Sequence, residues 1–166
     1  MNLNKRNFIN LSDIKKKDLD KILNRALSLK KSRIKSKLFK NSLSGVNLAM
    51  IFEKPSTRTR VSFEIAIKEL GGQAIILDEN TTHLARGETV SDTARVLDRY
   101  CHIFMIRTSN HNKLLEYQSF ANAPIINGLS NLSHPCQVMA DIMAYEENRG
   151  KIFKKKVTWM GDLNNV

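Results

Sequence analysis

LAMIFEKPSTRTR, residues 48–60, is the stretch from which we predict the fold. Its first five residues are continuously apolar and too few for a helix, which is typical of a buried strand. Pro55 then separates this strand from a helix expected over residues 61–70. Residues 56–60 bring hydroxyl groups, guanidinium groups and the unpaired amides of a helix start together, which suits a phosphate. The alternative is a polar helix cap with two solvated arginines, because Ser and Thr are favoured caps anyway.

Apolar spacing along the rest of the chain predicts strands that alternate with helices. We expect further helices over residues 17–36, 88–100 and 114–120 and from Pro135 onward, and further strands over residues 74–77, 102–107, 125–126 and 157–160. The helix over residues 61–70 is expected to be mostly buried, and residues 78–87 and 127–133 are expected to form loops. This alternation predicts an α/β fold, a parallel sheet with helices on both faces.

Three polar clusters follow expected strands, at residues 56–60, 107–108 and 134–137. Ligands of such sheets bind beyond the carboxyl ends of the strands, so we expect one shared anion site there. Arg107 could hold the oxygen of a polarised carbonyl, His134 could donate a second hydrogen bond to it, and Gln137 could accept from an amide. A phosphate beside a polarised carbonyl describes an acyl phosphate. The alternatives are a surface ion pair for Arg107, a helix-capping role for His134 and a solvated side chain for Gln137.

The net charge of +11 is concentrated at the N-terminus. Residues 1–40 hold 13 Lys or Arg and three Asp, so they contribute +10 of it. This pattern favours a solvated basic helix face, with polyanion binding as the alternative. Two separated cysteines and four scattered histidines give no disulfide or metal-binding spacing, and we expect no metal. The lack of a disulfide framework favours a reducing, cytoplasmic setting. We find no membrane-length apolar run and predict no targeting segment.

Several long motifs, in order along the chain, resemble those of the ornithine carbamoyltransferases. They are FEKPSTRTRVSFE at residues 52–64, DTARVL at residues 92–97 and HPCQ at residues 134–137. The resemblance extends from about Phe8 to Val166. Aspartate carbamoyltransferases share the STRTR and HPxQ elements, but Lys54 and residues 61–64 are more similar to the ornithine enzymes.

The resemblance implies an activity and a set of site residues. The carbamoyl group of carbamoyl phosphate would pass to ornithine, giving citrulline and phosphate in a step of the arginine-biosynthesis or urea-cycle type, with no metal or organic cofactor. Residues at the helix start would bind the phosphate, namely Ser56, Thr57, Arg58 and Thr59. Residues from the other two clusters would surround the carbamoyl group, namely Arg107, His134 and Gln137, with Arg107 and His134 as the catalytic pair.

The same resemblance implies a homotrimer, in which a loop matching residues 82–88 reaches the neighbouring subunit's carbamoyl-phosphate site. His83 stands there in place of the family's usual Gln, and Ala85 in place of a usual Gly. An imidazole ring cannot reproduce the paired donor and acceptor of an amide, so His83 departs from the family's pattern at this position.

The family's proteins carry a second domain of similar size that binds ornithine. We therefore expect residues 1–150 to be the carbamoyl-phosphate-binding domain and residues 151–166 to be the start of the second domain, its remainder absent. GDLNNV, residues 161–166, resembles the family's GDGNNV with Leu163 in place of Gly, and Asn165 matches an ornithine-binding position. We expect such a fragment to be inactive alone. The alternatives are a carbamoyltransferase for another amine, such as putrescine or aspartate, and a residual phosphate-binding or nucleic-acid-binding module.

Overall fold

The computed structural model describes residues 6–34, 42–78 and 87–162. Its centre is a sheet of four parallel strands in the order β2-β1-β3-β4. The strands are β1 (Asn47–Phe52), β2 (Gln73–Asp78), β3 (Ile103–Arg107) and β4 (Ile125–Leu129). The predicted parallel sheet is confirmed, and its carboxyl ends lie at one edge because every neighbouring pair is parallel.

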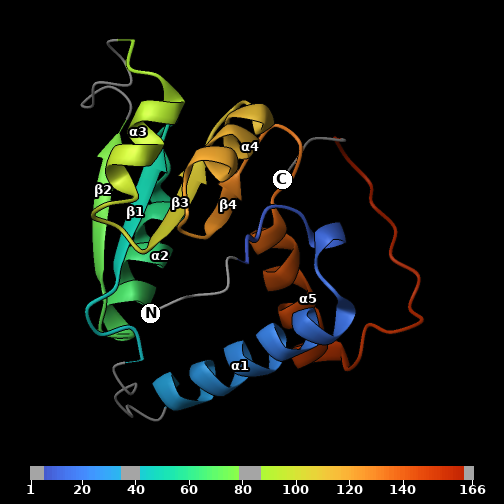
Figure 1. The fold of residues 1–166 in the computed structure, drawn as a ribbon. Coiled ribbons are helices and arrows are strands. Elements are labelled where there is room, and N and C mark those ends of the chain that lie inside the picture. The colour runs from blue at the N-terminus through green and yellow to red at the C-terminus, as the bar shows by residue number, and fades with distance from the viewer. Residues whose placement is uncertain (1–5, 35–41, 79–86, 163–166) are drawn as a thin grey trace.

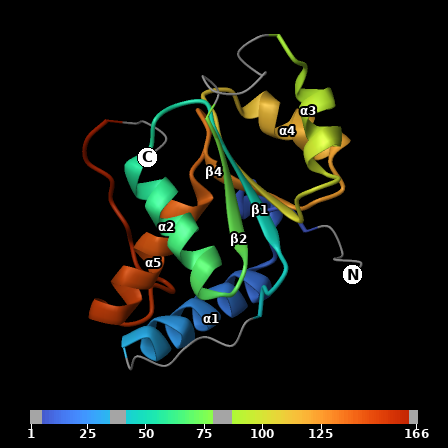
Figure 2. The same cartoon turned by 90° about the vertical axis from the view of Figure 1, so that its left-hand side faces the viewer.

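Helices cover both faces of this sheet, as predicted (Figures 1 and 2). They are a short 3-10 turn (Leu11–Asp13), α1 (Lys16–Ile34), α2 (Thr57–Glu69), α3 (Val90–Leu97), α4 (His111–Phe120) and α5 (Pro135–Arg149). One core cluster joins β1, β3 and β4 to α3 and α4, with Phe104 and Tyr117 packed edge to face. The second cluster lies on the other face, where Ile67 and Phe63 of α2 pack over Met50 and Met105.

The N-terminal segment lies along the outer edge of β4. Phe8 donates its N–H to the carbonyl of Ile125 at 2.7 Å and accepts from the N–H of Asn127 at 2.9 Å. β4 itself runs to Leu129, so the loop that we predicted from residue 127 starts only after Leu129, three residues later than predicted. The loop predicted over residues 78–87 lies mostly outside the described residues.

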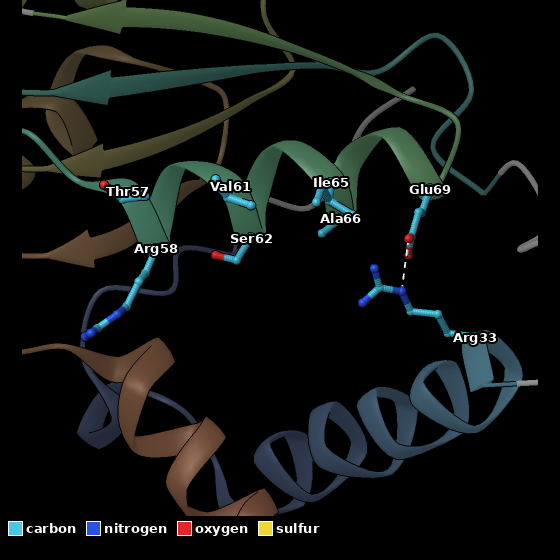
Figure 3. Close-up of a pocket in the computed structure, with 8 residues that line it drawn as sticks. All are labelled: Arg33, Thr57, Arg58, Val61, Ser62, Ile65, Ala66 and Glu69. Carbon is cyan, nitrogen blue, oxygen red and sulfur yellow. Dashed lines mark ion pairs between the residues drawn. The ribbon is translucent and has the colours of Figure 1, made fainter.

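The prediction that α2 is mostly buried is wrong. Val61 and Ile65 are 48% and 41% exposed, and only Thr59 and Ile67 of this helix are buried. Periodicity identifies an apolar face but does not say whether another element covers it. The sheet covers the face with Ile67, while Val61 and Ile65 line a pocket between α2 and α1 (Figure 3).

The strand predicted over residues 157–160 is also wrong. These residues have no regular structure, and Val157 and Met160 are 75% and 89% exposed. A strand requires a hydrogen-bonding neighbour, and none of the four described strands pairs with this segment. α1, the predicted basic helix, lies against α5, and its lysines are exposed. Among the described residues, no helix is long and apolar enough to span a membrane.

Candidate functional site

The start of α2 carries hydroxyl groups that the helix itself does not use. Ser56 is the N-cap residue in an extended conformation, and its side chain makes no capping hydrogen bond. Ser56 therefore does not act as an ordinary side-chain cap of α2, which was the alternative to a phosphate site. Thr57, Arg58 and Thr59 form the first turn, where backbone N–H groups have no partner within the helix. This turn is a suitable place for an anion, because hydroxyl donors and free amides converge there.

Arg107 is the last residue of β3 and lies beside the end of β1, where its register partner is Phe52. Its Nη1 donates a hydrogen bond to Thr59 Oγ1 at 3.2 Å, which joins two of the predicted clusters. Its Nε is buried and has no hydrogen-bond partner among the described residues. Burial lowers the pKa of the Arg107 guanidinium, but an arginine in a protein stays charged. Arg107 thus presents an unused charged donor beside the start of α2.

His134 follows β4 and is the N-cap residue of α5. Its side chain makes no capping hydrogen bond, so the alternative that His134 caps the helix with its side chain is wrong. Its buried Nδ1 has no hydrogen-bond partner among the described residues. Burial lowers the pKa of the His134 imidazole first, the Arg107 charge lowers it further, and Asp141 opposes them. His134 is therefore neutral near pH 7, with one ring nitrogen as donor and the other as acceptor. β3 and β4 are parallel neighbours, so Arg107 and the loop that leads to His134 follow strand ends at the same edge of the sheet.

Gln137 and Arg58 are exposed and take no part in the contact between Arg107 and Thr59. Gln137 Nε2 donates a hydrogen bond to Asp141 Oδ1 at 2.9 Å. In this structure Gln137 is therefore an exposed helix side chain, as the alternative interpretation predicted. Figure 3 shows the Arg58 side chain extending from α2 toward α5. The other predicted site residues, His83 and Asn165, lie outside the described residues, as do Ala85 and Leu163.

Sequence reasoning missed a polar network directly beside Arg107. Thr108 donates its hydroxyl to the Glu53 carboxylate, which also accepts a hydrogen bond from Lys113 Nζ at 2.6 Å. Thr108 belongs to the predicted cluster at residues 107–108, whereas Glu53 was not predicted as its partner, because their contact follows from the pairing of β1 with β3.

A second missed pair holds the loop between β4 and α5. His111 Nδ1 lies 2.8 Å from Ser130 Oγ, and both side chains are buried. Ser130 Oγ also accepts the N–H groups of Leu132 and Ser133. These three contacts of Ser130 Oγ, just before His134, indicate a structural role for this pair, because a buried Ser that is already bonded is not an exposed nucleophile.

The pocket shown in Figure 3 is separate from the Arg107 cluster. Its volume is about 530 Å³, and the residues that line it belong to α2, apart from Arg33 of α1. Arg33 pairs with Glu69 at 3.0 Å at one end, and Thr57 and Arg58 lie at the other. Apolar residues of α2 dominate the wall between them. The Arg107 cluster, by contrast, contains Thr59, which is buried on the side of α2 that faces Arg107.

The arrangement combines a helix start, a fixed positive charge and a neutral imidazole. Such a set can bind an anion and donate hydrogen bonds to a neighbouring carbonyl oxygen. No group of three or more possible metal ligands occurs within the described residues. The side chains of Thr59, Arg107 and His134 offer binding, orientation and stabilisation of developing negative charge.

Comparison with known proteins gives one consistent result. A family model described as "Aspartate/ornithine carbamoyltransferase, carbamoyl-P binding domain" matches residues 6–147. An ornithine carbamoyltransferase of Rhodopseudomonas palustris is 49% identical, over 97% of this chain and 53% of the relative. The solved ornithine carbamoyltransferase of Pyrococcus furiosus superposes with a TM-score of 0.93 at 44% identity, over 100% of this chain and 53% of that one.

An aspartate transcarbamoylase catalytic subunit of M. jannaschii is a more distant match, with a TM-score of 0.80 and 32% identity over 88% of this chain and 48% of that one. The chain thus spans about half the length of the curated relatives it matches.

Proposed function

Because the chain belongs to the aspartate/ornithine carbamoyltransferase family, we propose that it binds carbamoyl phosphate and supplies this half of an ornithine carbamoyltransferase active site. The observation that carries the proposal is a pair of buried nitrogens, Arg107 Nε and His134 Nδ1, that have no hydrogen-bond partner within the described part of the chain. Both belong to residues at the same edge of the sheet as Thr59. Buried polar atoms are almost always hydrogen-bonded, so two such atoms without a described partner at one edge suggest that a ligand completes them.

The proposed binding mode divides the ligand between two sets of residues. The phosphate lies at the start of α2, bound by the residues Ser56, Thr57, Arg58 and Thr59. The carbamoyl group lies toward the sheet, with its oxygen near Arg107 and its amide group near Gln137. Gln137 would exchange its bond to Asp141 for one to the ligand, which requires only rotation of an exposed side chain.

The reaction is transfer of the carbamoyl group to the side-chain amine of ornithine. The amine attacks the carbonyl carbon, the bond from that carbon to the phosphate oxygen breaks, and the amine loses a proton, giving citrulline and phosphate. Negative charge develops on the carbonyl oxygen during attack, where Arg107 and His134 stabilise it more in the transition state than in the ground state. The hydroxyl and amide donors of α2 favour departure of the phosphate. We infer no role for a metal or organic cofactor.

The proposal extends to assembly and setting. A homotrimer would let the loop over residues 82–88, with His83, reach the site of the neighbouring subunit, and Asn165 would contact ornithine. Both residues lie outside the described ones. A cytoplasmic role in arginine biosynthesis is the setting that this reaction implies.

Isothermal titration calorimetry with carbamoyl phosphate tests the proposed binding site. Arg58→Ala should weaken binding by roughly tenfold or more, since one charged contact to a phosphate is lost. Arg149→Ala is the matched control, because it removes the same charge at the far end of α5. Equal heats from the wild type and Arg58→Ala would contradict the site assignment.

A further inference from the structure

We propose that Glu53 is a positioning residue, whose carboxylate fixes the turn after β3 and thereby aims Arg107 at the start of α2. The inference rests on the carbamoyl-phosphate function proposed above and adds to it a residue that touches no substrate. It starts from the position of Glu53, which immediately follows β1, the strand that pairs with β3.

The backbone of Glu53 holds Arg107 directly. The N–H of Glu53 donates to the carbonyl oxygen of Arg107 at 3.0 Å, which continues the ladder between β1 and β3 by one step. Arg107 is thus held at its carbonyl by Glu53 and at its guanidinium by Thr59. A side chain anchored at both ends has few rotamers left, so small movements of the backbone change the direction of the guanidinium.

The side chain of Glu53 holds the next residue. The Glu53 side chain is only 10% exposed, and one of its carboxylate oxygens accepts a hydrogen bond from the hydroxyl of the buried Thr108. Thr108 Oγ1 in turn accepts the N–H of Asn110 at 3.0 Å, and the N–H of Thr108 donates to the carbonyl of Leu129 at 3.0 Å. The peptide after Arg107 is therefore held from β1 on one side and from β4 on the other.

The second carboxylate oxygen accepts a hydrogen bond from Lys113 Nζ at 2.6 Å. Lys113 belongs to the first turn of α4, so Glu53 connects the end of β1 to the helix that follows Arg107. A nearly buried carboxylate is expensive unless it is paired and hydrogen-bonded, and here both oxygens are occupied. Because Thr108 and Lys113 occupy them, the influence of Glu53 on the Arg107 guanidinium passes through the backbone.

Two substitutions separate the contacts. Glu53→Ala removes both partners of the carboxylate and frees the turn. Glu53→Gln keeps an oxygen for Thr108 but removes the charge that pairs with Lys113, so its effect should be smaller and in the same direction. Glu146→Ala is the matched control, because Glu146 also pairs with a lysine, Lys151, at 2.8 Å but lies near the far end of α5.

The first experiment needs no ligand. Magnetic resonance of the Arg107 Nε–H group, assigned by its loss in Arg107→Met, reports the order of this side chain. Glu53→Ala should broaden or shift this signal, Glu53→Gln should do so less, and Glu146→Ala should leave it unchanged. An unchanged signal in Glu53→Ala would overturn the proposal.

The second experiment compares two ligands by calorimetry, carbamoyl phosphate and inorganic phosphate. Glu53→Ala should weaken carbamoyl phosphate by about tenfold and phosphate by less than about twofold, because phosphate depends on α2 and the carbamoyl group on Arg107. A general loss of structure would weaken both ligands equally, and that result would overturn the proposal. If Glu53→Ala does not fold, Glu53→Gln gives the same comparison at smaller amplitude.

The two experiments also separate this inference from the proposed function. If the wild type does not bind carbamoyl phosphate, the proposed function fails, while the Arg107 signal still decides whether Glu53 positions Arg107. If the wild type binds and Glu53→Ala changes neither the signal nor the ratio of the two affinities, the function stands and the role of Glu53 is wrong.

Discussion

Replacing Arg107 by Met should leave the stability of the ligand-free protein almost unchanged while weakening its response to carbamoyl phosphate. Met is similar in length to the arginine stem, is apolar, and adapts to irregular space at the end of β3. Among the described residues, the Arg107 side chain makes one hydrogen bond, to Thr59 Oγ1 at 3.2 Å, and its buried Nε has no partner.

The size of the stability change follows from two opposing effects. Removing an unpaired buried donor removes a desolvation cost of roughly 1–3 kcal/mol. Losing the hydrogen bond to Thr59 costs roughly 0.5–1.5 kcal/mol, and the buried Thr59 hydroxyl loses this partner. The two nearly cancel, so we expect the free energy of unfolding to stay within about 1 kcal/mol of the wild type.

The effect of ligand is larger. At a ligand concentration of about 100 dissociation constants, binding stabilises the folded protein by about 2.7 kcal/mol, and a tenfold loss of affinity reduces this to about 1.4 kcal/mol. Urea unfolding with and without carbamoyl phosphate measures both quantities, with Arg149→Met as the control for the charge change. The reasoning is refuted if Arg107→Met loses more than about 2 kcal/mol without ligand, or keeps the full ligand response.

Three further substitutions test the surroundings of the site. Burial and the Arg107 charge hold the pKa of His134 below 6.5 in the folded protein. The stability that the neutral His134 contributes is therefore present above about pH 6.5 and lost as the pH falls through the folded-state pKa. His134→Gln should make the free energy of unfolding, measured in urea, less dependent on pH over this range. Gly128→Ala should destabilise by about 1–3 kcal/mol, because the new Cβ would overlap Sδ of the fully buried Met105; a normal urea midpoint would contradict this. Asp98→Ala should cost roughly 2 kcal/mol in thermal unfolding, because its carboxylate accepts the N–H groups of Asn122 and the buried Ala123, and Asp98→Asn should recover part of the loss.

The sheet and the convergence of two site residues were predictable because both follow from local pattern. The continuously apolar residues 48–52 and 103–106 are too few for helices and are typical of strands buried on both faces, and parallel pairing then brings their carboxyl ends together. The contact between Thr59 and Arg107 is a direct consequence. The position of Gln137 could not be predicted, since an exposed amide on a helix can pair with Asp141 or turn toward a ligand at little cost.

The Glu53 network was not predictable from pattern alone. For a glutamate that follows a strand, the sequence predicts a solvated loop residue, because carboxylates are seldom buried. Its burial depends on Thr108 and Lys113, which are 55 and 60 residues away in the chain. Only the pairing of β1 with β3 brings the three together, so the network becomes visible when the topology is known.

The two wrong predictions have one physical cause. Apolar spacing marks the surface of α2 with Val61 and Ile65 and the segment over residues 157–160, but burial requires a second element within contact distance. α2 is nevertheless anchored, because Ile67 packs on the sheet and Thr59 is buried beside Arg107. The face of α2 that carries Thr59 is therefore fixed by the sheet, whereas Thr57 and Arg58 line the pocket on the other face. This explains how the start of α2 can hold a defined geometry while Val61, two residues after Thr59, remains half exposed.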